Sequence, residues 1–308
     1  MKVSVKVPAT VANLGCGFDC FGLALPIYNT VTIQETVLPG SGIEINIHNK
    51  DHDDSTNNIP TDKNNIVYRA IELLYNFIGQ NPDELKIDID TGIPIARGLG
   101  SSASVVIGGL MAANELLGRP ADKSIIASIA TEIEGHPDNV IPAIYGGVNL
   151  SSWEDDGSVV FSQLPWCNDW KITICIPDYE LATDISRSVL PESVQLKDAI
   201  FNLRRTAMFT SALYTKDREL LKLSLKDRLH QPYRTKLVPG LNSIIKNLKH
   251  TKNVIGCTLA GAGPAIIVFS EKESIDEINE IVTQTWDDIN VSSEILTLPL
   301  ETTGVQVL

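Results

Sequence analysis

One short segment, rich in glycine and serine, has the composition of a phosphate-binding loop. It reads Pro94-Ile95-Ala96-Arg97-Gly98-Leu99-Gly100-Ser101-Ser102-Ala103-Ser104. Its glycines let the backbone approach a ligand closely, and an apolar run that predicts a helix follows at once. The first N–H groups and the positive dipole end of that helix would face an anion in the loop. The serine hydroxyls could also bind Mg²⁺.

The same segment has an ordinary structural explanation as well. Serine after a glycine turn caps the start of many helices, and the Gly-Lys-Ser/Thr ending of a Walker A loop is absent. Two further segments bend the chain tightly: residues 8–19 (PATVANLGCGFD), which contain Asn13 and Asp19, and residues 259–264 (LAGAGP). Each alone is more typical of a turn than of a binding site. Their order and the surrounding elements must therefore decide.

The first half of the chain combines strands with long apolar helices. Period-two alternation predicts strands over residues 3–7, 43–47 and 87–89, and helical periodicity predicts helices over 67–74, 101–117 and 122–134. Glycines end the last two helices, at Gly118 and Gly135. The helix over 101–117 thus begins inside the glycine-serine segment.

The second half has a different order of elements. The sequence predicts strands over 171–176, 254–259, 265–269 and 293–298, with helices over 198–215, 240–249 and 274–285. Apart from one extra helix this order is β-α-β-β-α-β, the ferredoxin-like arrangement. We therefore predict an α+β protein with two domains, residues 1–155 and 156–308.

Composition and charge exclude several classes of protein. The net charge is −13 and the isoelectric point is about 4.8, and such an acidic chain repels nucleic acid and anionic lipid. The N-terminal residues lack the apolar segment of a signal peptide, and no apolar run reaches the ~18 residues of a membrane span. The five cysteines are scattered, which is typical of reduced thiols. We expect a cytoplasmic protein with no nucleic-acid or membrane partner.

The three glycine-containing segments, in this order and on this pattern of elements, resemble the three signature motifs of the GHMP kinases (galacto-, homoserine, mevalonate and phosphomevalonate kinases). The resemblance spans essentially the whole chain. It implies a two-domain GHMP kinase architecture, with an N-terminal ATP-binding domain of the ribosomal-protein-S5-domain-2-like type and a ferredoxin-like C-terminal domain. It also implies ATP-dependent phosphorylation of a small alcohol with Mg²⁺.

Within that family the sequence is similar to the branch that phosphorylates the L-homoserine hydroxyl in threonine biosynthesis. The similarity is carried by PATVANLGCGFD at 8–19, GLGSSAS at 98–104, EGHPDNVIPAIYGG at 134–147, TDISRSVLP at 183–191 and the pair Tyr233-Arg234. Cys16 is a departure, because this branch usually has proline there. The resemblance further implies a homodimer.

The resemblance also implies roles for individual residues. Homoserine is a zwitterion, so its carboxylate suits the guanidinium groups of Arg187 and Arg234, and its ammonium suits Asp19. The full set of implied substrate-binding residues is Asn13, Asp19, His136, Thr183, Arg187, Arg234 and Gly261. The implied catalytic residues are Asn139, Asp138 and His136. Whether Asp138 acts as a general base, or no base is used, is left open.

For ATP, the resemblance implies that residues 94–104 hold the triphosphate and that Asn65 lies near the adenine. Ser102 and a glutamate just before Gly135 would hold Mg²⁺, with Glu132 as the first choice and Glu134 as the second. Two alternatives differ in class. Another GHMP kinase would act on a different alcohol, and a non-catalytic ligand sensor on the same fold would usually lack the phosphate loop or the magnesium carboxylate.

Overall fold

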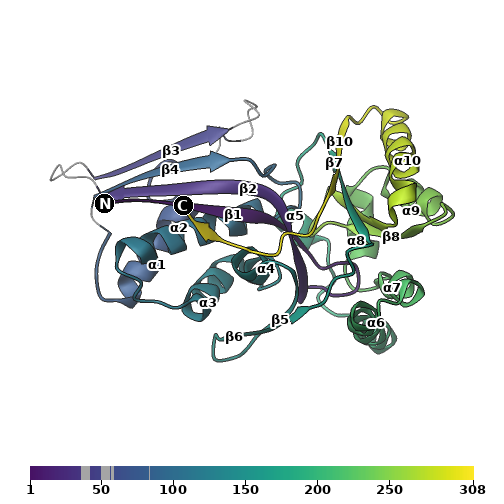
Figure 1. Ribbon diagram of the computed structural model, residues 1–308, viewed down its shortest axis with the longest axis horizontal. Coiled ribbons are helices and arrows are strands. Elements are labelled where there is room, and N and C mark those ends of the chain that lie inside the picture. Colours follow the sequence, from purple (N-terminus) through teal and green to yellow (C-terminus); the bar gives the residue numbers. More distant parts are fainter. Residues whose placement is uncertain (36–41, 50–55, 57–58, 83) are drawn as a thin grey trace.

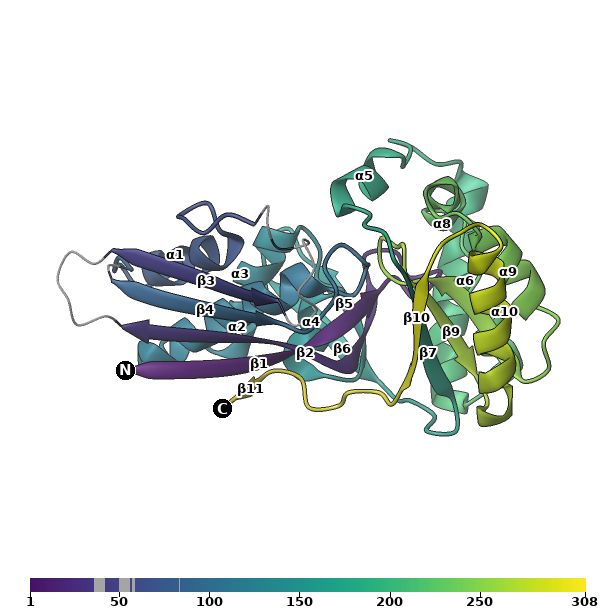
Figure 2. The same cartoon turned by 90° about the horizontal axis from the view of Figure 1, so that it is seen from above.

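Two β-sheets lie end to end along the long axis of the molecule (Figures 1 and 2). The computed structural model describes residues 1–35, 42–49, 56, 59–82 and 84–308. Both sheets carry helices, so the predicted α+β class is confirmed. Among the described residues, no helix is long and apolar enough to cross a bilayer.

The first sheet contains seven strands in the described part of the chain. Its path is β11-β1-β2-β4-β3, and β5 pairs with both β2 and β6. The strands are β1 (Lys2–Ala12), β2 (Phe21–Glu35), β3 (Ile43–Asn49), β4 (Leu85–Thr91), β5 (Val148–Trp153), β6 (Val159–Leu164) and β11 (Gln306–Val307). The predicted alternation of β1 is confirmed, because Val3, Val5 and Val7 are all buried in the core.

Four helices cover one face of this sheet, below it in Figure 1. They are α1 (Ile66–Phe77), α2 (Ser101–Leu116), α3 (Lys123–Glu134) and α4 (Val140–Tyr145). Helix α2 is central and apolar nearly all round, as its sequence predicts. Gly108 lets it lie close to the sheet, since a Cβ there would come within 2.6 Å of the Val31 side chain.

The second sheet has the strand order β10-β7-β9-β8 with antiparallel pairing throughout. Its strands are β7 (Lys171–Pro177), β8 (Val254–Leu259), β9 (Ile266–Ser270) and β10 (Ser293–Leu298). The order confirms the predicted ferredoxin-like arrangement. The helices of this half are α5 (Thr183–Ser188), α6 (Leu196–Thr215), α7 (Arg218–Ser224), α8 (Gln231–Arg234), α9 (Leu241–Leu248) and α10 (Ile275–Asp287).

The two halves are joined by more than one crossing of the chain. Strand β6 pairs with β5 in the first sheet, and the C-terminal tail returns so that β11 pairs with β1 (Figure 2). One hydrophobic cluster also combines Leu23 of β2 with Phe209 of α6 and Phe269 of β9. The division at 155/156 falls in the turn between β5 and β6, and it stays a prediction.

Asn29 on β2 connects this strand to the start of helix α2 through hydrogen bonds. Its side chain is fully buried. The Nδ2 group donates to Ser104 Oγ at 2.7 Å, and Oδ1 accepts from the backbone N–H groups of Gly92 and Ile93 at 2.8 and 2.9 Å. Asn29 therefore fixes the entry into the glycine-serine segment and the first turn of α2 together.

We expect Asn29→Asp to lower the free energy of unfolding by about 2–4 kcal/mol, because it buries a charge and removes the donor to Ser104. The Ser104 hydroxyl already donates its proton to Ser101 O. It could therefore donate to the new carboxylate at position 29 only by losing that hydrogen bond. Urea unfolding would measure the change. The control is Asn242→Asp, an exposed asparagine in the first turn of α9. Equal stability of the two variants would contradict this role of Asn29.

Candidate active site

A single continuous cavity of about 460 Å³ connects most of the sequence-predicted site residues. Ligand cavities are commonly apolar with a few well-placed polar groups. One part is apolar and is lined by Ile47, Ile66, Val67, Ile89, Ile95 and Val105. Another part is charged and is lined by Asp19, Asp138, Arg187 and Arg234. Residues 98–102 of the glycine-serine segment also line it.

The glycine-serine segment needs glycine at both predicted positions. Gly98 and Gly100 have φ angles of 79° and 68°, a region that disfavours other residues. Space is also short, because a Cβ on Gly98 would lie 2.2 Å from Ala260 O and one on Gly100 would lie 2.0 Å from Thr10 Oγ1. Helix α2 begins directly after Gly100. Its first N–H groups therefore lie at the cavity wall, as an anion site requires.

Ser102, at the start of α2, and Glu134, at the end of α3, contact each other in the wall of the cavity. Ser102 Oγ donates to Glu134 Oε1 at 2.7 Å, and both residues line the cavity. Burial raises the pKa of Glu134, and the hydrogen bond from Ser102 only partly offsets this. Glu132, the predicted first choice, is exposed and is not among the lining residues. The geometry thus favours the second choice, Glu134.

Asn65 lines the apolar part of the cavity and caps helix α1. Its Oδ1 accepts from Val67 N at 2.9 Å and its Nδ2 donates to Pro60 O at 2.6 Å. Both ends of the carboxamide are therefore engaged in the fold. An asparagine at the start of a predicted helix is a typical N-cap. The structure shows that Asn65 has this capping role, whether or not it also contacts a ligand.

Asp19, in the loop after β1, and Arg187, on helix α5, form a bidentate ion pair. The Arg187 Nη2 and Nη1 atoms donate to Asp19 Oδ1 and Oδ2 at 2.9 and 3.2 Å. Burial lowers the pKa of Arg187, but the hydrogen bond and charge of Asp19 outweigh it, so the pKa lies above its ordinary value. Thr183 also lines the cavity, one turn before Arg187 on α5.

Arg234 is almost completely buried, with 2% of its surface exposed. Its Nε donates to Ser186 O at 3.2 Å, and Nη1 contacts Gly261 O and His230 Nδ1, each at 3.3 Å. Nη2 has no hydrogen-bond partner in the described part of the chain. Burial and the neighbouring Arg187 lower the pKa of Arg234 to about 10, so the side chain stays cationic at neutral pH.

Both arginines lie near the ring of Phe18. The guanidinium carbons of Arg187 and Arg234 are 5.7 and 5.3 Å from its centre, and His230 stacks on it at 5.1 Å. Cation–π contact helps to hold two like charges near each other. Phe18 was not among the predicted site residues, although it stands inside the 8–19 motif.

Asn13 and Gly261 join the first and third motifs. The Asn13 Nδ2 group donates to Gly261 O at 2.9 Å, and its Oδ1 accepts from Asp19 N at 3.0 Å. The carboxamide thereby fixes the loop that carries Asp19. Cys16, the departure in this loop, is buried and does not line the cavity.

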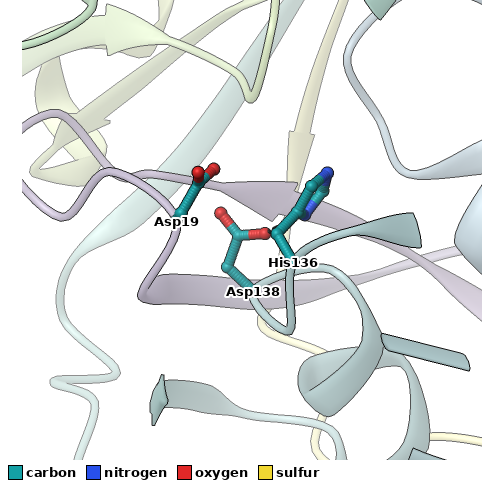
Figure 3. Close-up of side chains that lie close together, drawn as sticks. All are labelled: Asp19, His136 and Asp138. Atoms are coloured by element: carbon teal, nitrogen blue, oxygen red, sulfur yellow. Dashed lines mark hydrogen bonds and ion pairs between the residues drawn. The ribbon is translucent and has the colours of Figure 1, made fainter. Parts of the chain in front are cut away.

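His136 and Asp138 form a buried hydrogen-bonded pair next to Asp19. His136 Nδ1 lies 2.5 Å from Asp138 Oδ1, and the second Asp138 oxygen points toward Asp19 (Figure 3). That oxygen is buried without a hydrogen-bond partner in the described residues. Burial lowers the pKa of His136, but the charge and hydrogen bond of Asp138 outweigh it and leave the pKa raised.

Asp19, His136 and Asp138 each offer one ligand atom within 4.8 Å of the others, a spacing that could hold a cation. Arg187 already contacts both oxygens of Asp19, and His136 contacts one oxygen of Asp138. The two carboxylates are thus partly neutralised by protein. Asp138 Oδ2 still lacks a hydrogen-bond partner among the described residues, so the cluster could accept an N–H donor that carries a positive charge.

Asn139 follows this pair at the start of helix α4 and lines the cavity. Its Oδ1 accepts from the Thr10 hydroxyl at 2.8 Å. Thr10 was not predicted as a site residue. The one available signal was a hydroxyl side chain among the otherwise apolar residues 7–12 at the end of β1.

Comparisons with known proteins agree with this architecture. The model of the GHMP kinases N terminal domain matches residues 65–147, and that of the GHMP kinases C terminal domain matches residues 209–288. A homoserine kinase from Microchaete diplosiphon is 38% identical over 100% of this chain and 97% of its own, and one from Halothermothrix orenii is 38% identical over 98% and 95%. The crystal structure of homoserine kinase from Cytophaga hutchinsonii superposes with a TM-score of 0.88 at 28% identity, covering 100% of this chain and 97% of that one. The chain therefore belongs to the GHMP kinase family, in its homoserine kinase branch.

Proposed function

We propose that this chain transfers the terminal phosphoryl group of ATP to the hydroxyl of L-homoserine and releases O-phospho-L-homoserine. The observation that carries the proposal is the cavity itself, in which two aspartates, Asp19 and Asp138, and two arginines lie near the glycine-serine segment. A neutral sugar or a simple hydroxy acid would offer no positive charge to the carboxylates of Asp19 and Asp138 that line the cavity. The names of the full-length relatives support the same substrate.

The charged part of the cavity suits a zwitterion. Asp19 and Arg187 satisfy each other in the structure, and a zwitterion offers each of them a second partner of opposite charge. We assign the substrate carboxylate to Arg187 and to Nη2 of Arg234, which makes no hydrogen bond within the described part of the chain. We assign the ammonium to Asp19 and to the second oxygen of Asp138. Bidentate and charge-assisted hydrogen bonds of this kind are among the stronger polar contacts in proteins.

The remainder of the cavity suits a nucleotide. Its apolar part near Asn65 would take the adenine, and residues 94–104 would hold the phosphates with the N–H groups that begin α2. Ser102 and Glu134 supply two oxygen atoms of the type that Mg²⁺ prefers. Mg²⁺ neutralises charge on the phosphate oxygens when it is bound. We propose Glu134 for this role in place of Glu132.

Phosphoryl transfer depends mainly on positioning and on charge neutralisation. Asn139 and His136 both line the cavity. Asn139 lies beside Gly100 and His136 lies beside Asp19, and we place the substrate hydroxyl near these two side chains. Asp138 orients the His136 ring through Nδ1, which leaves the other ring nitrogen for the substrate. A homodimer, which the resemblance implies, stays a prediction.

A coupled assay of ADP release from Mg-ATP tests the proposal. L-homoserine, mevalonate, galactose and shikimate would be offered separately, beside a reaction without acceptor. Turnover with homoserine alone is the expected result. Turnover with a different alcohol would keep the ATP site and overturn the roles of Asp19, Arg187 and Arg234. ATP binding without turnover of any acceptor would favour a ligand sensor.

A further inference from the structure

Thr10 is a fully buried polar residue that touches two parts of the site at once. Its hydroxyl donates to Asn139 Oδ1 at 2.8 Å, and its backbone N–H donates to Leu99 O at 3.0 Å. The first contact reaches the start of α4 and the second reaches the phosphate loop. One residue of the rigid β1 strand therefore fixes both relative to each other.

The hydrogen bond also determines which way the Asn139 carboxamide points. Among the described residues, Asn139 Oδ1 is the one side-chain hydrogen-bond partner of the Thr10 hydroxyl. A buried hydroxyl proton needs an acceptor, so the amide oxygen must face Thr10. The Nδ2 group then points away from Thr10, and Asn139 lines the cavity.

Gly100 shows that this contact sits in a crowded place. A Cβ on Gly100 would lie 2.0 Å from Thr10 Oγ1 and 3.2 Å from Asn139 Oδ1. The phosphate loop therefore packs directly on the Thr10–Asn139 hydrogen bond. That bond lies beside the place where the loop would hold the transferred group.

We propose that Thr10 is a positioning residue, which directs the Asn139 Nδ2 group at the oxygen atoms that exchange the phosphoryl group. The inference rests on the proposed function, because it needs phosphoryl transfer to occur at this end of the loop. Asn139 makes the contact with the reacting oxygens, and Thr10 acts only through it. Loss of the hydroxyl should thus affect the rate of transfer more than the binding of either substrate.

Thr10→Val removes the hydroxyl and keeps the shape, whereas Thr10→Ser keeps the hydroxyl and removes a methyl group. We expect Thr10→Val to lower kcat about 10- to 100-fold, the usual effect of losing a supporting partner, while both KM values change less than about threefold. Thr10→Ser should keep kcat within about threefold of the wild-type value, because it retains the hydroxyl. Thr10→Ala replaces the valine variant if thermal unfolding shows that the latter does not fold.

A double-mutant cycle with Asn139→Ala separates positioning from a structural role. If Thr10 acts through Asn139, Thr10→Val should lower kcat little further once Asn139 is alanine. Full additivity of the two losses, or equal losses in the serine and valine variants, would overturn the proposal. Wild-type turnover of homoserine is measured in the same experiment, so failure of the proposed function would be seen separately.

Discussion

Replacing Arg234 with methionine is expected to raise the KM for homoserine about 30- to 1,000-fold, equivalent to about 2–4 kcal/mol of lost charge-assisted hydrogen bonding. The KM for ATP should change less than about threefold, because the nucleotide would bind at the other part of the cavity. Methionine is unbranched and can keep contact with the Phe18 ring. Steady-state kinetics with each substrate varied in turn would measure both constants.

The buried position of Arg234 requires a stability control for this variant. Its loss removes the donor to Ser186 O and His230 Nδ1, whereas Gly261 O keeps the hydrogen bond from Asn13, so the melting temperature should fall somewhat. Arg204→Met is the matched control, since Arg204 is an exposed arginine on α6 outside the cavity. It should leave both KM values unchanged. Equal increases in the KM for homoserine and for ATP with Arg234→Met would contradict the assigned role.

Local sequence patterns predicted most of the long helices and strands, but not every element. Helix α2 begins at Ser101 as predicted, because its apolar run and glycine entry are local signals. The long strand β2 was not predicted: its first residues are buried on both faces and show no alternation. The short helices α5 and α8 were missed as well, since tertiary contacts rather than periodicity hold them.

The motifs predicted which residues gather at the site, but the pairing of side chains came only from the fold. Asp19 and Arg187 are far apart in the sequence and meet because α5 lies over the loop after β1. Thr10 and Asn29 act through buried hydrogen bonds between segments distant in the sequence. Such contacts leave no pattern in a single sequence beyond a polar residue within a strand.

The choice between Glu132 and Glu134 could have been made from the helical period. The buried residues of α3 are Ile126, Ala127, Ala130 and Thr131. Continuing that stripe by one turn from Ala130 reaches position 134, whereas position 132 falls on the opposite side. The Glu134 carboxylate therefore lies on the buried face of α3, where it contacts Ser102. Its proposed role as a Mg²⁺ ligand can be tested directly.

Glu134→Gln is expected to lower kcat about 100- to 1,000-fold and to raise the Mg²⁺ concentration for half-maximal rate, because an amide binds the cation far less well than a carboxylate. Glu132→Gln is the matched control on the same helix turn, and it should behave like wild type. Activity measured over a Mg²⁺ titration separates the two. A normal Mg²⁺ profile for Glu134→Gln would overturn the proposed metal ligand.

The stability of Glu134→Gln should move in the opposite direction from its activity. Since burial raises the pKa of Glu134 in the folded chain, the folded state holds this proton more tightly than the unfolded state. Its contribution to stability is therefore largest below the ordinary carboxyl pKa and is lost as the pH rises through the raised value. Glutamine keeps an oxygen for the Ser102 hydroxyl and carries no charge. At neutral pH without Mg²⁺, the variant should melt at the same temperature as wild type or higher, so a clearly lower melting temperature would show that the kinetic loss reflects damage to the fold.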